Sequence, residues 1–378
     1  MFIKEVYAKK IKDSRSEDTI EVSVNKCKAS APEGKSKGKY ETPAYYQSLD
    51  WNIRAINLLK FNFPIKEFQD LKKIEDHIIS VCEFSNAKEF GANALFALES
   101  AILKALARSK KKQLWEIINL KATKLPTPLG NAVGGGQHSE QFSAHPVFQE
   151  FLVIPKGRDF KDKLRNMNEV YEKLGKLLKA KSKNDEGAWQ CALSEEEILD
   201  LLSKFKFKVR IGLDAASSSF YKDGEYQYHE FDLNTDEQIK YINNLIEKYN
   251  LLYIEDPLQE EDFIKFKKIK KKALVSGDDL TATNIKRLKK AIFFDSINAM
   301  IIKPNQNGSL LEVAEIFEIC KKNRIKTILS HRSGETMDSA IADLAFGFQA
   351  DYIKCGISTK WRESKLNRLL EIENSLKK

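Results

Sequence analysis

Residues 325–336 read Ile-Lys-Thr-Ile-Leu-Ser-His-Arg-Ser-Gly-Glu-Thr, a short apolar and β-branched run that ends abruptly in a polar cluster. The run predicts a β-strand, and the apolar spacing of residues 337–348 predicts a helix after it. His331, Arg332 and Ser333 offer an imidazole, a forked cation and a hydroxyl at the end of this strand. These groups suit an anionic, oxygen-rich ligand such as a phosphate or a carboxylate.

The same layout recurs along the second half of the chain. Further apolar runs each end in one charged residue, namely Asp214, Glu255, Asp278, Lys303 and Lys354. Stretches with helical spacing separate these runs, at residues 236–249, 261–271, 283–292 and 309–322. Alternating strands and helices predict a parallel sheet, and this many units favours a closed α/β barrel of the TIM type over an open sheet. Since the active site of such a barrel lies where its strands end, three acids and two lysines are expected to converge there.

The first part of the chain predicts an α+β domain. Residues 2–11 and 19–24 alternate like two strands of a meander, and residues 64–119 are mostly helical in their apolar spacing. Residues 31–40 are rich in Gly, Ser and Lys, which predicts a mobile surface loop, although the glycine spacing does not match a Walker A motif. Paired prolines at positions 126 and 128 suggest a linker. We therefore predict an α+β domain over residues 1–124 and the barrel over residues 125–378.

Composition argues against several protein classes. The 378 residues contain no apolar run approaching the ~20 residues that span a bilayer, and the first residues lack the apolar core of a signal peptide. The five cysteines have no metal-type spacing, and their odd number fits reduced thiols better than a disulfide framework. We expect a soluble, cytoplasmic protein with no membrane partner.

The net charge of +9 comes largely from short runs of lysine. Nucleic-acid binding is one interpretation of these runs. They lack interleaved aromatic residues, however, and lie in amphipathic helical contexts, so a solvated face is favoured and nucleic acid is not expected as a partner. A positive field would also speed the arrival of an anionic substrate.

Several short strings, in order along nearly the whole chain, resemble the enolase family, the phosphopyruvate hydratases of glycolysis. In the first domain these are Asp13-Ser14-Arg15, the loop around Ser36, and Gly91-Ala92-Asn93-Ala94. In the barrel they are Gly212-Leu213-Asp214-Ala215, Ile254-Glu255-Asp256-Pro257, Gly277-Asp278-Asp279-Leu280, Ile302-Lys303-Pro304-Asn305, Ser330-His331-Arg332-Ser333-Gly334 and Ile353-Lys354-Cys355-Gly356. The resemblance implies an enolase-type fold, a homodimer, and a small phosphorylated acid as substrate.

The resemblance also implies two Mg²⁺ ions at each active site. Asp214, Glu255 and Asp278 are expected to hold the first ion. Converging carboxylates repel one another without a cation, and hard oxygen donors suit magnesium. Ser36 corresponds to the loop residue that closes over the second Mg²⁺, which the substrate would bridge.

Catalytic roles follow from the same resemblance. Lys303 is expected to be the base that removes the proton next to the substrate carboxylate, with its pKa lowered by Mg²⁺ and Lys354. Glu186 matches the acid that assists departure of the hydroxyl. The remaining substrate-site residues are expected to be His138, Glu150, His331, Arg332, Ser333 and Lys354.

Some positions depart from the family pattern. Glu33 stands where Ser is usual, so an extra negative charge is expected near the phosphate and the metal. The other departures are the lengthened turn between His138 and Glu150, Asn184 and Ala188 in place of glycines around Glu186, and Lys360-Trp361-Arg362-Glu363 in place of an R-S-E segment linked to substrate-site and dimer contacts. Three hypotheses follow: an enolase, an enolase-fold enzyme acting on another phosphorylated or carboxylated hydroxy acid, and a non-catalytic scaffold. The retained lysines and acids favour the first.

Overall fold

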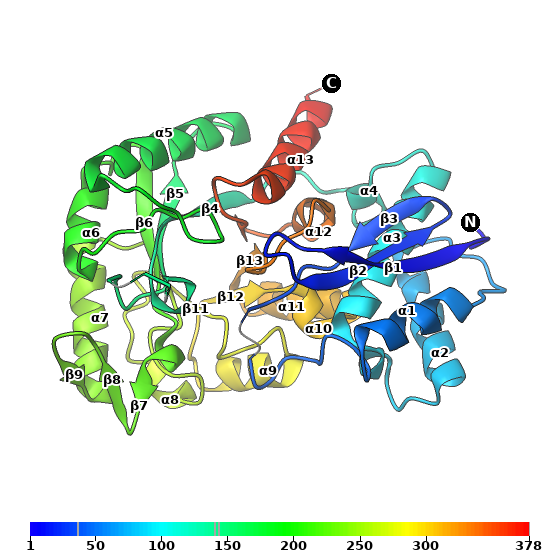
Figure 1. The fold of residues 1–378 in the computed structure, drawn as a ribbon, viewed down its shortest axis with the longest axis horizontal. Coiled ribbons are helices and arrows are strands. Elements are labelled where there is room, and N and C mark those ends of the chain that lie inside the picture. The colour runs from blue at the N-terminus through cyan, green and yellow to red at the C-terminus, as the bar shows by residue number, and fades with distance from the viewer. Residues whose placement is uncertain (36–37, 140, 143, 378) are drawn as a thin grey trace.

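The computed structural model describes the whole chain except residues 36, 37, 140, 143 and 378. An amino-terminal part made of a sheet and helices lies beside a carboxyl-terminal barrel (Figure 1). The sheet is antiparallel, with strands β1 (Val6–Lys12), β2 (Asp18–Val24) and β3 (Cys27–Ser30). The helices that follow are α1 (Leu49–Leu58), α2 (Leu71–Cys82), α3 (Ala92–Ser109) and α4 (Leu114–Ile118). The α+β prediction is confirmed, although β3 and α1 were not expected from the sequence.

The second part closes into the predicted barrel. Around it run β4 (Thr127–Gly134), β5 (Glu150–Pro155), β6 (Val209–Asp214), β10 (Tyr253–Glu255), β11 (Leu274–Gly277), β12 (Ala299–Ile302), β13 (Lys326–Ser330) and β14 (Tyr352–Lys354), which pairs back to β4. The helices of this part are α5 (Phe160–Leu178), α6 (Glu195–Ser203), α7 (Thr235–Tyr249), α8 (Phe263–Phe266), α9 (Ile285–Phe293), α10 (Pro304–Asn307), α11 (Leu310–Lys322), α12 (Ala340–Gly347) and α13 (Lys360–Leu376). A small sheet of β7 (Tyr221–Lys222), β8 (Glu225–Gln227) and β9 (Asp232–Leu233) follows β6.

Strand β5 departs from the all-parallel sheet that the sequence predicted. It follows β4 through the 3-10 turn η3 (Gly136–Ser139) and runs antiparallel to both β4 and β6. A loop can join antiparallel strands, whereas parallel strands need a longer crossover. The amino end of β5 therefore lies at the barrel end where the other strands finish, and Glu150 pairs in register with Gly134 and Asp214. The reversal explains how an acid at the start of a strand reaches the predicted site.

Apolar side chains cover both faces of the barrel strands. One buried cluster consists of Leu129, Leu152, Ile154, Tyr253, Ala299, Ile301 and Ile328. The neighbours of Ile301 on β12, Met300 and Ile302, belong instead to the larger core shared with the helices and the amino-terminal part. Because successive side chains of a strand point to opposite faces, β12 contributes to both clusters. Burial on both faces accounts for the nearly continuous apolar runs in the sequence.

Helix α3 connects the two parts. It is almost wholly buried and packs against β2 and β3, and also against α10 of the barrel part. Gly91 precedes the helix with a φ of 99°, and a Cβ there would lie 2.5 Å from the Cα of Tyr45. Only glycine suits that backbone, which positions the buried Asn93 in the first turn of the helix. The boundary between residues 124 and 125 stays a prediction.

Of the helices in the described ranges, none is both long and apolar enough to cross a lipid bilayer.

Candidate active site

Charged side chains converge on a pocket of about 270 Å³. The predicted site residues that line it are Glu150, Glu186, Asp214, Asp278, Lys303, His331, Arg332, Ser333 and Lys354. Glu255 is fully buried beside the pocket and bonds to Lys354. The amino-terminal part contributes Gly34, Lys35, Gly38, Lys39 and Glu41, so residues from both parts of the chain form the walls.

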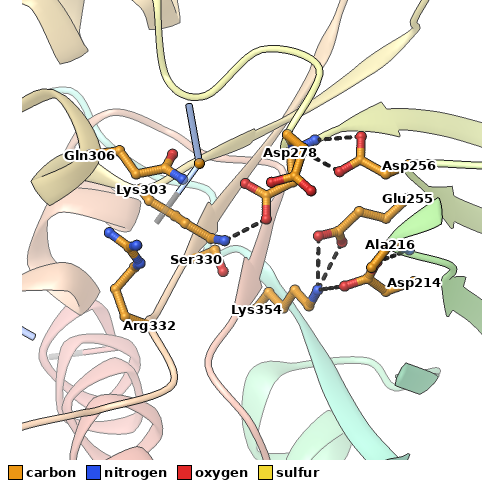
Figure 2. Close-up of polar contacts among 12 residues, drawn as sticks. Asp214, Ala216, Glu255, Asp256, Asp278, Lys303, Gln306, Ser330, Arg332 and Lys354 are labelled. Carbon is orange, nitrogen blue, oxygen red and sulfur yellow. Dashed lines mark hydrogen bonds and ion pairs between the residues drawn. The ribbon is translucent and has the colours of Figure 1, made fainter. Parts of the chain in front are cut away.

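Lys354 lies at the centre of a buried group of acids (Figure 2). Its Nζ lies 2.9 Å from Asp214 Oδ2, 2.9 Å from Glu255 Oε2 and 3.1 Å from Glu150 Oε2. Burial acts to lower the pKa of Lys354, but these carboxylates outweigh burial and hold its pKa well above the usual value. Lys354 is therefore a fixed cation in the pocket.

Two of the acids around Lys354 also have raised pKa values, in their case because burial outweighs the attraction of the lysine. Burial and the charge of Asp214 raise the pKa of Glu255 to about 8, despite the contact with Lys354. Burial likewise raises the pKa of Glu150 well above its ordinary value. One lysine does not fully balance this group, which leaves it suited to further positive charge.

Lys303 faces Lys354 across the pocket and bonds to Asp278 Oδ2 (Figure 2). Burial acts to lower the pKa of Lys303, but the Asp278 carboxylate outweighs it and the pKa is raised. The sequence-based expectation of a lowered pKa does not hold for these residues as they stand, because Asp278 stabilises the ammonium form. A cation bound to Asp278 would offset the carboxylate charge that raises the pKa of Lys303.

The structure also brings Asp278 together with two acids that the sequence analysis assigned no role. Ligand oxygens of Asp256, Asp278 and Asp279 lie within 4.8 Å of one another. Both oxygens of Asp256 accept backbone amides, at 3.1 Å from Asp278 and 2.7 Å from Asp279, so Asp256 also fixes the turn after β11. The adjacent acid pairs Glu255-Asp256 and Asp278-Asp279 were the available signal in the sequence.

The donor set fits a divalent cation. Asp278 Oδ1 is buried without a hydrogen-bond partner among the described residues. Burial and neighbouring Asp278 raise the pKa of Asp279 to about 7. Crowded carboxylate oxygens with an unused acceptor are the ligands that Mg²⁺ prefers, and a cation would relieve their repulsion.

Glu186 lies in a tight turn whose geometry depends on Asn184. The side-chain oxygen of Asn184 accepts the amides of Glu186 at 3.1 Å and Ala188 at 2.9 Å. Tyr171 donates its hydroxyl hydrogen to the carbonyl of Gly187 at 2.5 Å. Asn184 thus caps the turn, and Glu186 remains buried in the pocket wall.

His331 and Glu186 come close to each other, with His331 Nε2 3.9 Å from Glu186 Oε2. Burial lowers the pKa of His331 well below its usual value, despite the charge of Glu186. The imidazole is therefore neutral near pH 7, and its Nδ1 has no hydrogen-bond partner within the described part of the chain. Such a ring can donate to or accept from a substrate oxygen.

Arg332 is held by an acid that sequence reasoning missed. Its Nη2 lies 2.9 Å and 3.1 Å from the two carboxylate oxygens of Glu41, 291 residues away in the chain. The Ser333 hydroxyl accepts the Lys35 amide at 2.7 Å and a hydrogen bond from Arg15 at 3.3 Å. The predicted phosphate contacts are thus bound to the amino-terminal part.

Arg362 lies within the altered segment 360–363, which the sequence linked to the substrate site without predicting a role for this arginine. Its side chain is fully buried, and Nη2 donates to the Ser333 carbonyl at 2.9 Å and lies 3.8 Å from Glu186 Oε1. Gly356 makes room for it, because a Cβ there would lie 2.5 Å from Arg362 Cδ. Arg362 therefore links the Glu186 turn to the polar cluster after β13.

For two predicted site residues the structure does not describe the side chain. Ser36 lies outside the described residues, and the structure describes His138 only as part of the turn η3. The other predicted residues line the pocket or, in the case of Glu255, lie buried beside it, and the roles assigned to them stay predictions.

Comparisons with known proteins agree along the whole chain. The family described as "Enolase, N-terminal domain" matches residues 3–118, and "Enolase, C-terminal TIM barrel domain" matches residues 122–378. An enolase of Archaeoglobus fulgidus is 35% identical over 402 residues, covering 100% of this chain and 98% of its own. An enolase of Sulfurisphaera tokodaii is 38% identical over 400 residues, covering 98% and 95%. With both domains matched and full-length relatives above 30% identity, the chain belongs to the enolase family.

Proposed function

We propose that this chain is a phosphopyruvate hydratase, a hydro-lyase that interconverts 2-phosphoglycerate and phosphoenolpyruvate in glycolysis and gluconeogenesis. The observation that carries the proposal is one pocket in which the buried Lys354 and the half-buried Lys303 face each other among carboxylates, in a chain similar over its full length to enolases. The alternative, an enolase-fold lyase for another hydroxy acid, is not favoured because the relatives above are named enolase throughout. A scaffold without catalysis would not need this arrangement of charges.

In the proposed reaction Lys303, as a neutral amine, takes the proton from the carbon next to the substrate carboxylate. The ammonium of Lys354 stabilises the negative charge that then develops on the carboxylate, which is the type of effect that contributes most to many enzymes. Glu186 donates a proton to the departing hydroxyl, and neutral His331 lies beside it. Arg332 and Ser333 bind the phosphate, with Glu150 and His138 completing the substrate contacts.

Asp214, Glu255 and Asp278 are the proposed ligands of a first Mg²⁺, and Ser36 is the proposed contact of a second. Their support is the unused oxygen of Asp278 and the raised pKa of Glu255. Bound Mg²⁺ would supply positive charge at the substrate carboxylate and draw the Asp278 charge away from Lys303. The wider proposal is a cytoplasmic homodimer that binds neither membrane nor nucleic acid.

Removal of the metal tests this proposal. Purified protein with Mg²⁺ is expected to form phosphoenolpyruvate from 2-phosphoglycerate, and excess EDTA is expected to lower kcat at least about a hundredfold, because the developing charge loses its main stabilisation. The measurement is the initial rate of phosphoenolpyruvate formation, with Mg²⁺ added back to restore it. Absence of turnover from folded, Mg²⁺-loaded protein would overturn the proposal and direct attention to other hydroxy acids.

The contact between Arg362 and Glu186 yields a second prediction. Arg362→Met is expected to lower kcat/KM in the presence of Glu186 more than in a Glu186→Gln background, with a coupling energy of about 0.5–3 kcal/mol. The physical reason is that the buried guanidinium, 3.8 Å from Glu186 Oε1, helps to fix the position of the Glu186 carboxyl group in the pocket wall. Steady-state kinetics of both single variants and the double variant measure the coupling.

Arg368 offers the matched control for that cycle. It lies on the same helix, α13, but pairs with Asp343 at 2.8 Å. Arg368→Met should show no coupling to Glu186. Equal coupling of Arg362 and Arg368 to Glu186 would mean that substitutions on helix α13 lower kcat/KM only by destabilising the protein.

A further inference from the structure

Glu33, which directly precedes the pocket-lining Gly34, bonds to other segments of the chain through both its backbone and its side chain. Its backbone pairs with Gly334 in an antiparallel bridge, with both N–H to O distances at 2.8 Å. Gly334 permits this approach, since a Cβ there would lie 2.7 Å from the Glu33 carbonyl oxygen. Glu33 is thus fixed against the polar cluster that follows β13.

The side chain of Glu33 bonds to the start of α3. Its Oε2 accepts a hydrogen bond from Asn93 Nδ2 at 2.5 Å. Asn93 is 2% exposed and Glu33 is half-buried, so the contact is partly shielded from water. Hydrogen bonds to a charged group are roughly twice as strong as neutral ones.

The contact determines which way the Asn93 amide points. A carboxylate only accepts, so the Asn93 NH₂ group must face Glu33 and its Oδ1 must face the other way. That oxygen accepts from Asn305 Nδ2 at 2.8 Å, and the same Nδ2 lies 3.0 Å from the Pro32 carbonyl oxygen. The chain of contacts therefore returns to the segment that carries Glu33.

Asn305 connects this network to the pocket. It lies in α10, which begins immediately after Lys303, and its neighbour Gln306 lines the pocket wall. Gln306 Nε2 in turn contacts Glu41, the partner of Arg332. A shift of α10 would displace residues on both sides of the pocket.

We propose that Glu33 is a positioning residue, which fixes the orientation of the Asn93 amide and thereby ties residues 32–35 to the helix that follows Lys303. The role depends on hydrogen bonding by the carboxylate and not on repulsion of an anionic substrate. The two explanations differ in what they predict for Glu33→Gln, which keeps an acceptor oxygen but loses the charge.

Limited trypsin digestion tests the proposal without reference to catalysis. Lys35 and Lys39 are exposed in the segment that follows Glu33, and mass spectrometry measures cleavage after each. Glu33→Ala is expected to speed cleavage about tenfold, the equivalent of losing one such hydrogen bond. Glu33→Gln should stay much closer to the unaltered protein, and Glu225→Ala, at an exposed position on β8, should not change the rate.

A paired exchange provides the sharper test. Asn93→Asp should also speed cleavage, because it places two carboxylates against each other. Combining it with Glu33→Gln should restore resistance, since the introduced amide can donate to the introduced carboxylate, which still accepts from Asn305. If Glu33 acted only by filling space, the double variant would not regain resistance to trypsin.

Kinetics complete the test, and only this part rests on the proposed hydratase activity. Glu33→Ala should lower kcat with a smaller change in KM, whereas Glu33→Gln should retain most of kcat. Equal behaviour of the two variants with a lowered KM would overturn the proposal in favour of charge repulsion. Cleavage of Glu33→Ala no faster than that of Glu225→Ala would overturn it even if the chain did not act on 2-phosphoglycerate.

Discussion

Lys303→Ala is expected to lower kcat by about 10²–10⁴, the range that one positioned general base contributes. The fall equals about 3–5 kcal/mol of transition-state stabilisation, and KM should change much less because Lys303 acts on the reacting carbon. A second readout separates proton removal from hydroxyl departure. In D₂O, exchange of the proton next to the carboxylate of 2-phosphoglycerate should disappear with Lys303→Ala and persist with Glu186→Gln.

Lys289→Ala provides the control for this substitution. Lys289 is exposed on α9, within the same barrel, and should leave both turnover and exchange unchanged. Persistent exchange in Lys303→Ala would assign proton removal to another residue. Loss of exchange in both Lys303→Ala and Glu186→Gln would contradict the division of roles between them.

The sequence was sufficient to predict most of the pocket residues, because many of them lie at the ends of barrel strands. Asp214, Glu255, Lys303 and Lys354 each end or directly follow a barrel strand, and parallel strands that close into a barrel bring such ends together. A local pattern of apolar residues followed by a charge is enough to find residues placed in this way. That pattern does not reveal the direction of a strand. Only the structure, in which β5 runs antiparallel to its neighbours, explains why Glu150 at the start of β5 lines the pocket.

Contacts between distant segments account for what sequence reasoning missed. Glu41 meets Arg332 across 291 residues, and Glu33 meets Asn93 across 60. Neither acid lies at a strand end or in a periodic pattern, so both contacts depend on the tertiary packing of segments that are distant in the chain. Arg362 is similar, since its burial depends on the space beside Gly356. The side chain of Glu33 bonds to Asn93 on α3, and the expectation of an extra negative charge near the phosphate stays a prediction.

Lys354→Met is expected to have the second large effect, on stability and on activity together. The substitution keeps much of the volume of the side chain but removes the cation among Glu150, Asp214 and Glu255, which are at most 2% exposed. Breaking a buried ion pair by removing one partner typically costs about 3–5 kcal/mol. Loss of the charge that stabilises the reacting carboxylate should also lower kcat by about 10²–10³. Thermal unfolding and steady-state kinetics measure the two effects.

Lys365→Met separates the metal hypothesis from general destabilisation. Lys365 is also buried, at 1% exposed, and its Nζ pairs with Glu335 at 2.7 Å away from the pocket wall. Both variants should unfold at lower temperature than the unaltered protein. Mg²⁺ should recover more of the lost Tm in Lys354→Met than in Lys365→Met, because only the first leaves Asp214 and Glu255 without their lysine. If Mg²⁺ raised the Tm of both variants equally, those two acids would not be metal ligands, and Asp278 with its neighbours Asp256 and Asp279 would become the better candidates.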